Sequence, residues 1–487
     1  MARPSPLEVY GLLDKSNCGD CGYDTCMAFA TDLLERKIRI EDCTHLMQDP
    51  KQKKNLKKLR EMIMPPQKPV RIGVGERELT IGGEEVLMRH QLTFYNPTGI
   101  FVEVPDTHGD LAKVSKYLTE AAVERMGEKL TLDGIALRCV SKNAEDFKNA
   151  AKKIAENTNL PIMLCCLEPE FLIAAATEIK NVKPALYAAT KETWEKVGTF
   201  AVQNDLPIIA VSPSGDLDEL MSLSATLQKL GSDQIILDPG TFFGEGNIKL
   251  TYDNIQQLRI AAIDKENENA GWPVMGVPAA YWTQYDIEGD EEEIWKHKYQ
   301  EIIMASIMIA IDTSLIIIHT GQEEEDIWAL LALVTLRQSI FSDPRVYPTV
   351  DPGLYEIGEP GPDAPVFVTS NYRLTKIPVE IDIKGANLDA YLLVSDSEGI
   401  GIESAVAGGQ FSAGSIAESV KEFNVFDKVD HRILIIPGMA ARLSGALEDE
   451  ADAFVLVGPR DSSGIGKFID KQWDPKKYMK EYEERKE

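Results

Sequence analysis

The spacing of apolar and polar positions separates strand-like from helix-like segments along the chain. Between residues 70 and 340, short runs rich in Val, Ile and Leu alternate with longer segments whose apolar residues recur every three or four positions. Runs that are apolar throughout indicate parallel strands buried on both faces. The strand-like runs are Ile100–Val104, Gly134–Val140, Pro161–Leu167, Ala185–Ala189, Pro207–Val211, Gln234–Leu237, Pro273–Val277 and Ser314–Ile318. The pattern predicts an α/β fold with a central (β/α)8 TIM barrel, and a long doubly wound sheet is the alternative.

The first part of this region has a different pattern. Arg71–Gly75 and Glu78–Ile81 are short apolar runs followed by two glycines, which predicts a β-hairpin ahead of the barrel. The first helical segment after Ile100–Val104 is expected to extend from Ala112 to Met126.

Proline clusters mark the domain boundaries. Pro65, Pro66 and Pro69 predict a linker that lets an N-terminal domain, residues 1–62, move relative to a barrel formed by residues 70–340. In the N-terminal domain, a basic run from Lys51 to Arg60 is typical of a solvated helix face, or alternatively of a docking contact.

A second proline-rich stretch, residues 341–365, predicts another linker. Residues 366–487 then return to strand–helix alternation and predict a smaller, doubly wound α/β domain. The strand-like runs of this domain are Val366–Thr369, Val379–Ile383, Tyr391–Val394, Arg432–Ile436 and Ala453–Val457.

Composition narrows the functional classes. The chain has 487 residues and a formal net charge of −27, which disfavours nucleic-acid binding because phosphate recognition needs a basic surface. The longest apolar run, Ile302 to Ile318, contains Asp312 and predicts a buried helix followed by a buried strand rather than a membrane span. An exposed low-potential metal cluster, the site considered next, would suit a reducing, anaerobic cytoplasm.

Four of the seven cysteines lie close together near the N-terminus. Cys18, Cys21, Cys26 and Cys43 have the spacing C-x2-C-x4-C-x16-C. Four thiolates in one segment are the ligand set of a [4Fe-4S] cluster. Structural zinc is the alternative, but zinc sites usually pair two short cysteine or histidine motifs, whereas the fourth ligand here is single and distant. A disulfide framework is not expected in a large chain of this kind.

The residues around these cysteines support a tight metal-binding loop. Gly19 and Gly22 allow the backbone to adopt positive φ angles around a cluster. Asp24 or Thr25 is expected to cap a helix that extends to about Lys37. Cys26 would then lie in the first helical turn, where the helix dipole favours a thiolate.

Polar residues at the expected carboxyl ends of the barrel strands form no acid–base pair with diagnostic spacing. These residues are Glu103, Asp106, Arg138, Glu168, Thr190, Ser212, Asp238 and His319. Each is as readily a buried hydrogen-bonding residue as a catalyst, and His319 is interpreted as structural. Cys139, Cys165 and Cys166 are expected to be core residues, because free cysteine packs as a small apolar group.

Three strands of the last domain end in turns of small residues. Leu392–Val394 is followed by Ser395–Gly401, Leu434–Ile436 by Pro437–Gly445, and Phe454–Val457 by Gly458–Gly464. Glycine and serine at the carboxyl ends of parallel strands form the crevice in which open α/β sheets bind cofactors, although ordinary turns also favour them. The chain has neither G-x-G-x-x-G after a first strand nor G-x4-G-K-[ST], so no nucleotide is specifically indicated.

Taken together, these features resemble the large (gamma) subunit of the corrinoid iron–sulfur protein, as found in the archaeal acetyl-CoA decarbonylase/synthase complex. The resemblance rests on the cysteine spacing, the domain order, Ile435-Ile436-Pro437-Gly438, Leu443-Ser444-Gly445 and Val457-Gly458-Pro459-Arg460. It implies that Cys18, Cys21, Cys26 and Cys43 bind a [4Fe-4S] cluster and that the last domain binds a corrinoid (cobamide). The corrinoid-binding residues that it implies are Thr369, Thr375, Asp396, Ser397, Glu398, Gly399, Ile400, Gly438, Leu443, Ser444, Gly445, Gly458, Arg460 and Ser462.

Histidine ligation of cobalt is not expected. Many corrinoid domains use the His of a D-x-H-x-x-G motif, but Asp106-Thr107-His108 is followed by Leu111 where glycine is required. His431 also lacks that context. The family accordingly implies a base-off corrinoid without a protein His ligand.

The resemblance implies a methyltransferase subunit. Its cobalt, as Co(I), would accept a methyl group from methyl-tetrahydrosarcinapterin or methyltetrahydrofolate and exchange it with the nickel cluster of acetyl-CoA synthase, while the [4Fe-4S] cluster returns Co(II) to Co(I). The implied partners are the small (delta) corrinoid iron–sulfur subunit, as a heterodimer, and the acetyl-CoA synthase/decarbonylase subunit. An iron–sulfur corrinoid-activating or electron-transfer protein without its own tightly bound corrinoid is the alternative.

Overall fold

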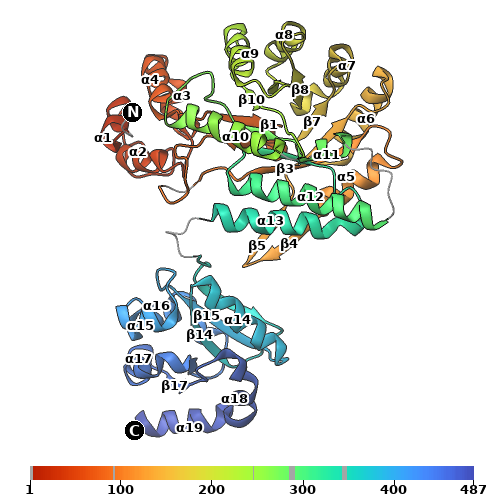
Figure 1. Cartoon of the computed structure of the whole chain (residues 1–487). Helices are drawn as coiled ribbons and strands as arrows, with labels where there is room; N and C mark the ends of the chain where they lie inside the picture. The colour runs from red at the N-terminus through yellow and green to blue at the C-terminus, as the bar shows by residue number, and fades with distance from the viewer. Residues whose placement is uncertain (1–3, 92–93, 245, 285–290, 343–347, 487) are drawn as a thin grey trace. The chain divides into compact units, whose positions relative to one another are not determined.

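A computed structural model describes residues 4–91, 94–244, 246–284, 291–342 and 348–486. The chain divides into two compact units. The first contains residues 1–123 and 130–342, and the second contains residues 124–129 and 343–487. Each unit is described separately (Figure 1).

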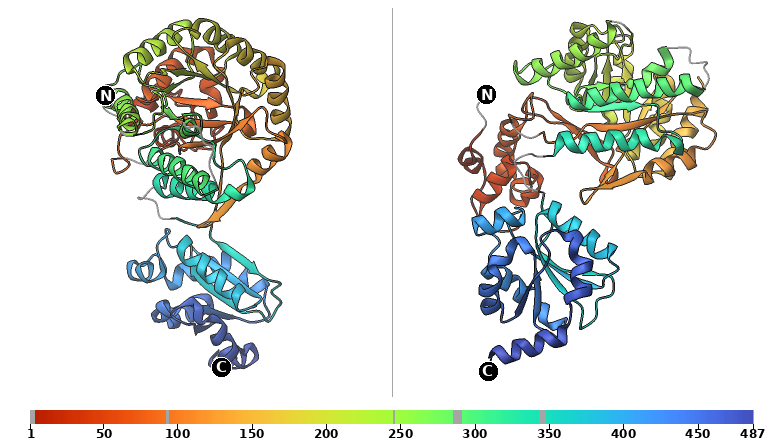
Figure 2. Two further views of the ribbon diagram at one scale, coloured as in Figure 1. Left: turned by 45° about the vertical axis from the view of Figure 1, so that its right-hand side comes forward. Right: turned by 60° about the horizontal axis from the view of Figure 1, so that its bottom comes forward.

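The first unit contains a nearly closed parallel β-barrel, surrounded by a ring of helices (Figure 2). The strand order is β10-β9-β8-β7-β6-β3-β12-β11, and a parallel bridge between Leu237 and Val274 joins the two ends of the sheet. The strands are β3 (Gly99–Pro105), β6 (Gly134–Arg138), β7 (Ile162–Cys165), β8 (Ala185–Ala189), β9 (Ile208–Val211), β10 (Ile235–Asp238), β11 (Met275–Gly276) and β12 (Leu315–Ile318). All eight predicted strands are therefore present, and the barrel interpretation is confirmed over the alternative of an open sheet.

The barrel helices form where the apolar residues recur at helical spacing. In α9, Asp216 caps the first turn by accepting hydrogen bonds from the backbone of Asp218 and Glu219, and Leu220 and Leu227 are fully buried. The helices are α5 (Leu111–Glu120), α6 (Ala144–Asn157), α7 (Pro169–Ile179), α8 (Trp194–Asn204), α9 (Leu217–Leu230), α10 (Asn247–Ile263), α11 (Tyr281–Gln284), α12 (Glu291–Ala310) and α13 (Ile327–Phe341).

Two hairpins accompany the barrel. The predicted hairpin is confirmed, since β1 (Pro69–Ile72) pairs antiparallel with β2 (Leu79–Gly82). The predicted helix Ala112–Met126 is wrong at its C-terminal end, because α5 ends at Glu120 and is followed by β4 (Ala122–Arg125) and β5 (Glu128–Thr131). Positive φ angles at Met126 and Gly127 provide the tight turn between β4 and β5.

The N-terminal segment has a small core of its own within the first unit. Val9, Phe29, Leu46 and Leu59 are among its buried residues. Its helices are α1 (Pro6–Leu12), α2 (Cys26–Leu34), α3 (Thr44–Gln48) and α4 (Lys53–Ile63). The basic residues of α4 are exposed, as a solvated face requires.

Two arginines connect this segment to the residues beside the barrel: Arg39 lies 3.6 Å from Glu78, and Arg36 makes the larger set of contacts. The Arg36 guanidinium donates to the carbonyl oxygen of Gly83, lies 2.7 Å from Glu85 and stacks 3.8 Å from the ring centroid of Tyr95. These contacts lie on residues beside the hairpin β1–β2. The segment therefore packs against the barrel in this structure, and its predicted mobility stays a prediction.

The second unit is built on a five-stranded sheet of order β13-β15-β14-β16-β17. Four strands are parallel, and β13 pairs antiparallel with β15 at one edge. The strands are β13 (Gly353–Ile357), β14 (Val366–Ser370), β15 (Ala390–Ser395), β16 (Ile433–Ile436) and β17 (Phe454–Val457). β13 lies within residues 341–365, the stretch for which the sequence predicts a linker.

Helices cover both faces of this sheet and enclose two apolar cores. The helices α15 (Ile402–Gly408), α16 (Ala413–Glu422) and α17 (Ser444–Ala451) contribute to one core. The helices α14 (Arg373–Gly385), α18 (Ile465–Gln472) and α19 (Pro475–Lys486) contribute to the other.

One predicted strand of this unit is wrong. Val379–Ile383 lies in α14, where Glu380 pairs with Lys376 on one side and Lys384 on the other at the i, i+4 spacing of a helix. Ile383 is fully buried in the core of this face, so tertiary packing outweighs the β-branched composition.

Among the described residues, none of the helices has the length and apolar character needed to cross a lipid bilayer.

Candidate cofactor sites

Three of the four N-terminal cysteines surround the small core of their segment. Cys43 is buried, Cys21 and Cys26 are half-buried against the core, and Cys18 is exposed. Gly19 and Gly22 have φ angles of +80° and +83°, as predicted for a loop that folds around a cofactor. The loop thus presents Cys18 and Cys21 from one short stretch of backbone beside Cys26, and Cys43 follows after α2.

Helix α2 holds Cys26 at its first position. Thr25 is the N-cap, and its side chain accepts a hydrogen bond from the backbone of Ala28 at 3.1 Å. The backbone N–H of Cys26 donates to Asn17 Oδ1 at 2.8 Å. The predicted cap and position of Cys26 are confirmed, although the helix ends at Leu34 rather than near Lys37.

The thiols interact electrostatically, although three of them lie in or against the small apolar core. Burial raises the pKa of Cys43, and the negative charges of Cys21, Asp14 and Cys26 raise it further. A bound cationic centre would offset this repulsion, since metal binding requires deprotonated thiols. The four-thiolate donor set therefore fits an iron–sulfur cluster.

The structure adds two residues that the sequence interpretation left out. Ligand atoms of Cys18, Asp20 and His45 lie within 4.8 Å of one another. The His45 ring lies 3.3 Å from Asp14 on one side and 3.3 Å from Asp20 on the other. The sequence could have indicated Asp20, because it lies between Cys18 and Cys21. His45 lies near them only because of the fold.

In the second unit, the loops implied to bind a corrinoid all follow carboxyl ends of parallel strands. β14 is the first of these strands, β15 pairs with it on one side and β16 pairs with it on the other. The strand order thus reverses at β14, and open α/β sheets bind ligands outside such a switch point.

Asn371 organises the loop after β15 and was missed by the sequence analysis. Its Oδ1 accepts hydrogen bonds from the backbone of Ser397 and Gly399, each at 3.0 Å, and from the Ser397 hydroxyl at 2.9 Å. Its Nδ2 donates to Asp396 Oδ1 at 2.9 Å. A side chain at the end of β14 therefore fixes the shape of the neighbouring loop, including Glu398 and Gly399, whose φ angles are +56° and +71°.

Two hydroxyl groups at the carboxyl end of β14 are buried without a partner. Within the described part of the chain, Thr369 Oγ1 and Ser370 Oγ make no hydrogen bond, and both residues are fully buried. Consecutive strand residues face opposite sides of a sheet, so these two hydroxyls lie on opposite faces of β14. Buried hydroxyls are normally hydrogen-bonded, and one without a partner beside a switch point is a candidate contact for a polar ligand. Thr375, in the first turn of α14, lies opposite Gly401, and its Oγ1 would be about 4.0 Å from a side chain's Cβ at that position.

The loops after β16 and β17 approach each other through glycines. Gly438 N donates to the carbonyl oxygen of Pro459 at 3.0 Å, and Gly458 N donates to that of Ile436 at 2.9 Å. A Cβ on Gly438 would lie 2.8 Å from the backbone N of Arg460, so this approach requires glycine. Of the other residues implied by the resemblance, Ser444 and Gly445 begin α17 after Leu443, Ile400 follows the Asp396–Gly399 loop, and Ser462 begins the short helix before α18.

His431 lies away from these loops. It precedes β16, at the amino end of the strand, and is buried. Its Nε2 lies 2.9 Å from the carbonyl oxygen of Ala364, and its Nδ1 accepts from the backbone of Ile433 at 3.2 Å. Both ring nitrogens are therefore engaged by backbone, which leaves none for a metal.

At the carboxyl end of the barrel, Glu103 is the centre of a polar network. Its carboxylate oxygens lie 2.5 Å from Arg138 Nε and 2.7 Å from His319 Nδ1. Burial alone would raise the pKa of Glu103, but the hydrogen bond and charge of His319, together with Arg138, hold it below its ordinary value. Glu103 is thus an ionised residue, and the structural interpretation of His319 agrees with this pairing.

The other polar residues at strand ends have mostly structural contacts. Asp106 accepts from the backbone of Val140 and Ser141, both at 2.9 Å, and so anchors the loop after β6. Thr190 and Ser212 bond to neighbouring turn residues. Asp238 accepts from the Tyr187 hydroxyl at 2.7 Å, and burial raises its pKa to about 6.

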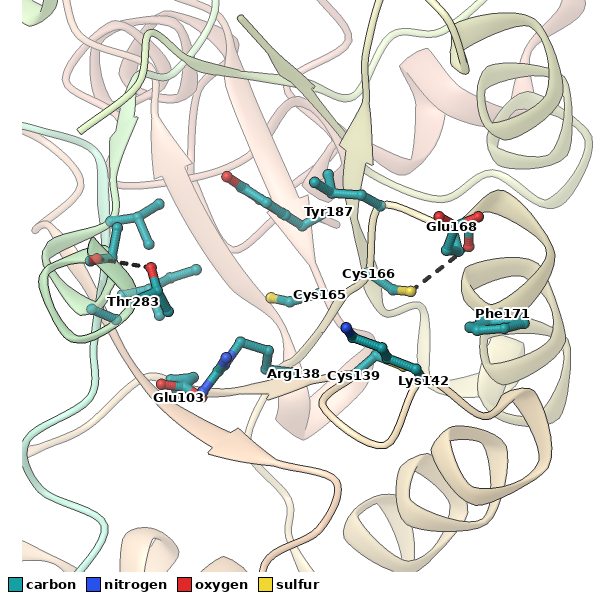
Figure 3. A pocket seen from close by; sticks show the side chains of 15 residues that line it. Glu103, Arg138, Cys139, Lys142, Cys165, Cys166, Glu168, Phe171, Tyr187 and Thr283 are labelled. Carbon is teal, nitrogen blue, oxygen red and sulfur yellow. Dashed lines mark hydrogen bonds and ion pairs between the residues drawn. The ribbon is translucent and has the colours of Figure 1, made fainter. Parts of the chain in front are cut away.

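Cys139, Cys165 and Cys166 pack on the barrel core, as predicted, and they also line a cavity of about 710 Å³ at the carboxyl end of the barrel strands. Arg138, Glu168 and Tyr187 also line it, and Figure 3 shows it from close by.

Comparison with protein families identifies the chain's relatives. Residues 69–469 match the family model described as "CO dehydrogenase/acetyl-CoA synthase delta subunit", and residues 13–45 match one described as "Putative Fe-S cluster". The second match spans Cys18, Cys21, Cys26 and Cys43.

Curated relatives match along the whole chain and are named "Acetyl-CoA decarbonylase/synthase complex subunit gamma". The protein of Archaeoglobus fulgidus is 41% identical over 98% of this chain and 100% of its own length. Those of Methanothermobacter thermautotrophicus and Methanosarcina acetivorans are each 39% identical, over 96% and 97% of this chain and 98% and 99% of their own lengths.

Proposed function

This chain belongs to the family of acetyl-CoA decarbonylase/synthase complex gamma subunits, and we propose that it is the subunit that carries a methyl group on a corrinoid. It would act as a methyl-tetrahydrosarcinapterin or methyltetrahydrofolate:corrinoid iron–sulfur protein Co-methyltransferase. The methyl group would come from the pterin and be exchanged with the nickel cluster of the acetyl-CoA synthase subunit.

The observation that carries this proposal is the unpartnered, buried hydroxyl of Thr369 at the switch point of the second unit. A corrinoid has amide groups around its periphery, and these supply both donors and acceptors for such hydroxyls. Asn371 holds the loop Asp396–Gly399 ready for contact, and Gly438 lets the last two loops approach closely. The second unit would thus bind the corrinoid by preformed loops, which lowers the entropic cost of binding.

A bound corrinoid supplies a cobalt centre that, when reduced, accepts and releases a methyl group. The chain's part is to bind and orient it. Both ring nitrogens of His431 are held by backbone groups, which supports a base-off corrinoid without a histidine ligand from the second unit.

Cys18, Cys21, Cys26 and Cys43 would hold a [4Fe-4S] cluster that restores the reduced state of the cobalt. This assignment is supported by the thiol-rich loop that leads into α2, whose first residue is Cys26. The proposed assembly is a heterodimer with the small (delta) subunit, bound in turn to the acetyl-CoA synthase subunit, in the cytoplasm.

Metal analysis of the anaerobically purified heterodimer tests the proposal. We expect about one cobalt and about four iron atoms per gamma chain, and a corrinoid visible spectrum. Iron without cobalt would contradict it and would favour the alternative, a corrinoid-activating or electron-transfer protein.

Thr369→Val tests the carrying observation, because it removes the hydroxyl and keeps the shape. We expect the cobalt content to fall severalfold while the iron content stays unchanged, as measured by plasma mass spectrometry. Thr177→Val is the matched control, since that hydroxyl bonds to Ile173 on a barrel helix. Equal cobalt in both variants would show that the Thr369 hydroxyl does not contact the corrinoid.

Cys26→Ala tests the cluster's role. We expect the variant to lose reductive activation of Co(II) but to retain methyl transfer when the cobalt is supplied already reduced. Visible spectroscopy follows the two processes in separate experiments. One measures the reduction of Co(II) after a low-potential chemical reductant is added, and the other measures methyl transfer. Survival of both activities would mean that the cluster has a different role.

A further inference from the structure

The cavity at the carboxyl end of the barrel belongs to neither cofactor site. Its volume of about 710 Å³ is within the range of small-molecule sites, and its lining comes from the ends of several barrel strands. In (β/α)8 barrels this end is where ligands bind and react. Residues of β3, β6, β7 and β8 converge there, together with Val277, Ala279 and Thr283 from the segment after β11 (Figure 3).

Much of the wall is apolar. Leu167 and Phe171 lie on one side, and Val277 and Ala279 contribute from the opposite part of the barrel. The thiols of the cavity add to this surface, because burial raises the pKa of Cys165 and raises that of Cys166 to about 12. Protonated thiols are poor ligands for a soft metal ion, so these sulfurs serve as packing surface.

The cationic groups are placed to receive an anion. Arg138 uses Nε to bind Glu103, which leaves its two terminal nitrogens for another ligand, and its side chain is 37% exposed. Lys142 lines the same cavity, its side chain points inward in Figure 3, and no partner for it lies within the part of the chain that the structure describes.

The carboxylates of the cavity do not compete for these cations. Both oxygens of Glu103 are engaged, one by Arg138 and the other by His319. Glu168 is exposed and lies away from Arg138 in Figure 3. The groups that remain available to a ligand at this end of the cavity are therefore positively charged.

We propose that this cavity binds a small organic carboxylate, with its head group between Arg138 and Lys142 and an apolar body against Phe171, Leu167 and Val277. Arg138 would hold the carboxylate with its two terminal nitrogens, the geometry that a planar guanidinium favours. The apolar wall favours a ligand with an apolar body. An inorganic anion would contact only the cationic end of the cavity. The inference stands apart from the corrinoid and cluster assignments, which concern other residues.

Calorimetric titration of the full-length protein with 2-naphthoate and 2-naphthamide tests the proposal. The two probes share one apolar body and differ in charge. We expect 2-naphthoate to bind at least about tenfold more tightly, the factor that one charge-assisted hydrogen bond contributes to an affinity. Equal affinities would overturn the proposal, as would tight binding of inorganic phosphate that displaces the probe.

A matched pair of variants assigns the effect to the cavity. Lys142→Met should reduce the difference between the two probes severalfold while Arg138 still binds the carboxylate, and folding should not be affected because Lys142 is exposed. Lys116→Met makes the same charge change on α5, where the lysine pairs with Glu120, and should leave the difference intact. The same loss in both variants, or a crystal structure with 2-naphthoate bound elsewhere, would show that the cavity is not the site. Protein free of cobalt should give the same results, so failure here is distinguishable from failure of the proposed methyl-carrier function.

Discussion

At the scale of single residues, Asp238 is a buried carboxyl group paired with a neutral partner. It lies at the end of β10, accepts from the Tyr187 hydroxyl and from the backbone of Gly240 at 2.8 Å, and is 1% exposed. Burial raises its pKa to about 6, from about 3.9 in an unfolded chain. Folding therefore favours the protonated form, and this contribution to stability is complete below pH 4 and is lost as the pH rises through 6.

Asp238→Asn should remove this pH dependence. The amide can keep both hydrogen bonds, accepting from Gly240 and donating to the Tyr187 oxygen. Between pH 4 and pH 7, the free energy of unfolding of the natural protein should fall by about 2 kcal/mol relative to the variant. Urea unfolding across this range, followed by fluorescence, measures the difference. The exposed Asp218→Asn provides the control, and a parallel pH dependence in all three proteins would refute the assignment.

Residues whose role depends on near neighbours were predictable, and those that depend on distant ones were not. Thr25 and Gly19 act within their own turn, so their chemistry is visible in the sequence. Asn371 acts on a loop that follows a different strand, and Tyr187 on Asp238 two strands away. Nothing in local sequence reports such pairings, because the fold creates them.

At the scale of elements, helix α2 links the N-terminal cysteines to their small core. Thr25→Ala removes the side-chain cap and should lower the stability of this segment by about 1 kcal/mol. Because Cys26 is the first helical residue, we expect iron to be released severalfold faster to a chelator. Thr31→Ala is the control on the same helix, since its hydroxyl bonds to Met27 within the helix. Equal release rates would show that the cap does not support the cluster.

Elements with a strong apolar pattern were predicted well, and those decided by packing were not. The eight barrel strands are apolar throughout, and each was found close to its predicted position. Val123 to Lys129 contains good helix formers, yet the turn at Met126 and Gly127 makes it a hairpin. Val379–Ile383 has a strand-like composition but lies in α14, because Ile383 fits the core and the ion pairs follow helical spacing.

At the scale of the whole molecule, the order of the parts was predictable, whereas their contacts were not. The sequence indicated a cysteine-rich segment, a barrel and a smaller α/β region in that order. The packing of the cysteine-rich segment through Arg36 onto Gly83 and Tyr95 had no sequence signal, since those residues are distant along the chain. The cavity at the barrel mouth likewise depends on the closure of the sheet.

The net charge of −27 has a consequence for the stability of the folded chain. A compact state holds like charges closer together than an unfolded one, so self-repulsion destabilises it. Raising the ionic strength from 0.01 M to 1 M shortens the Debye length from about 30 Å to about 3 Å and should screen most of this repulsion. We therefore expect the melting temperature to rise by several degrees between these limits, most of it below 0.3 M, as measured by calorimetry. Screening depends on ionic strength alone, so KCl, NaCl and tetramethylammonium chloride should act alike. A rise that continues linearly beyond 1 M, or that differs among the three salts, would instead indicate specific ion effects on the protein surface.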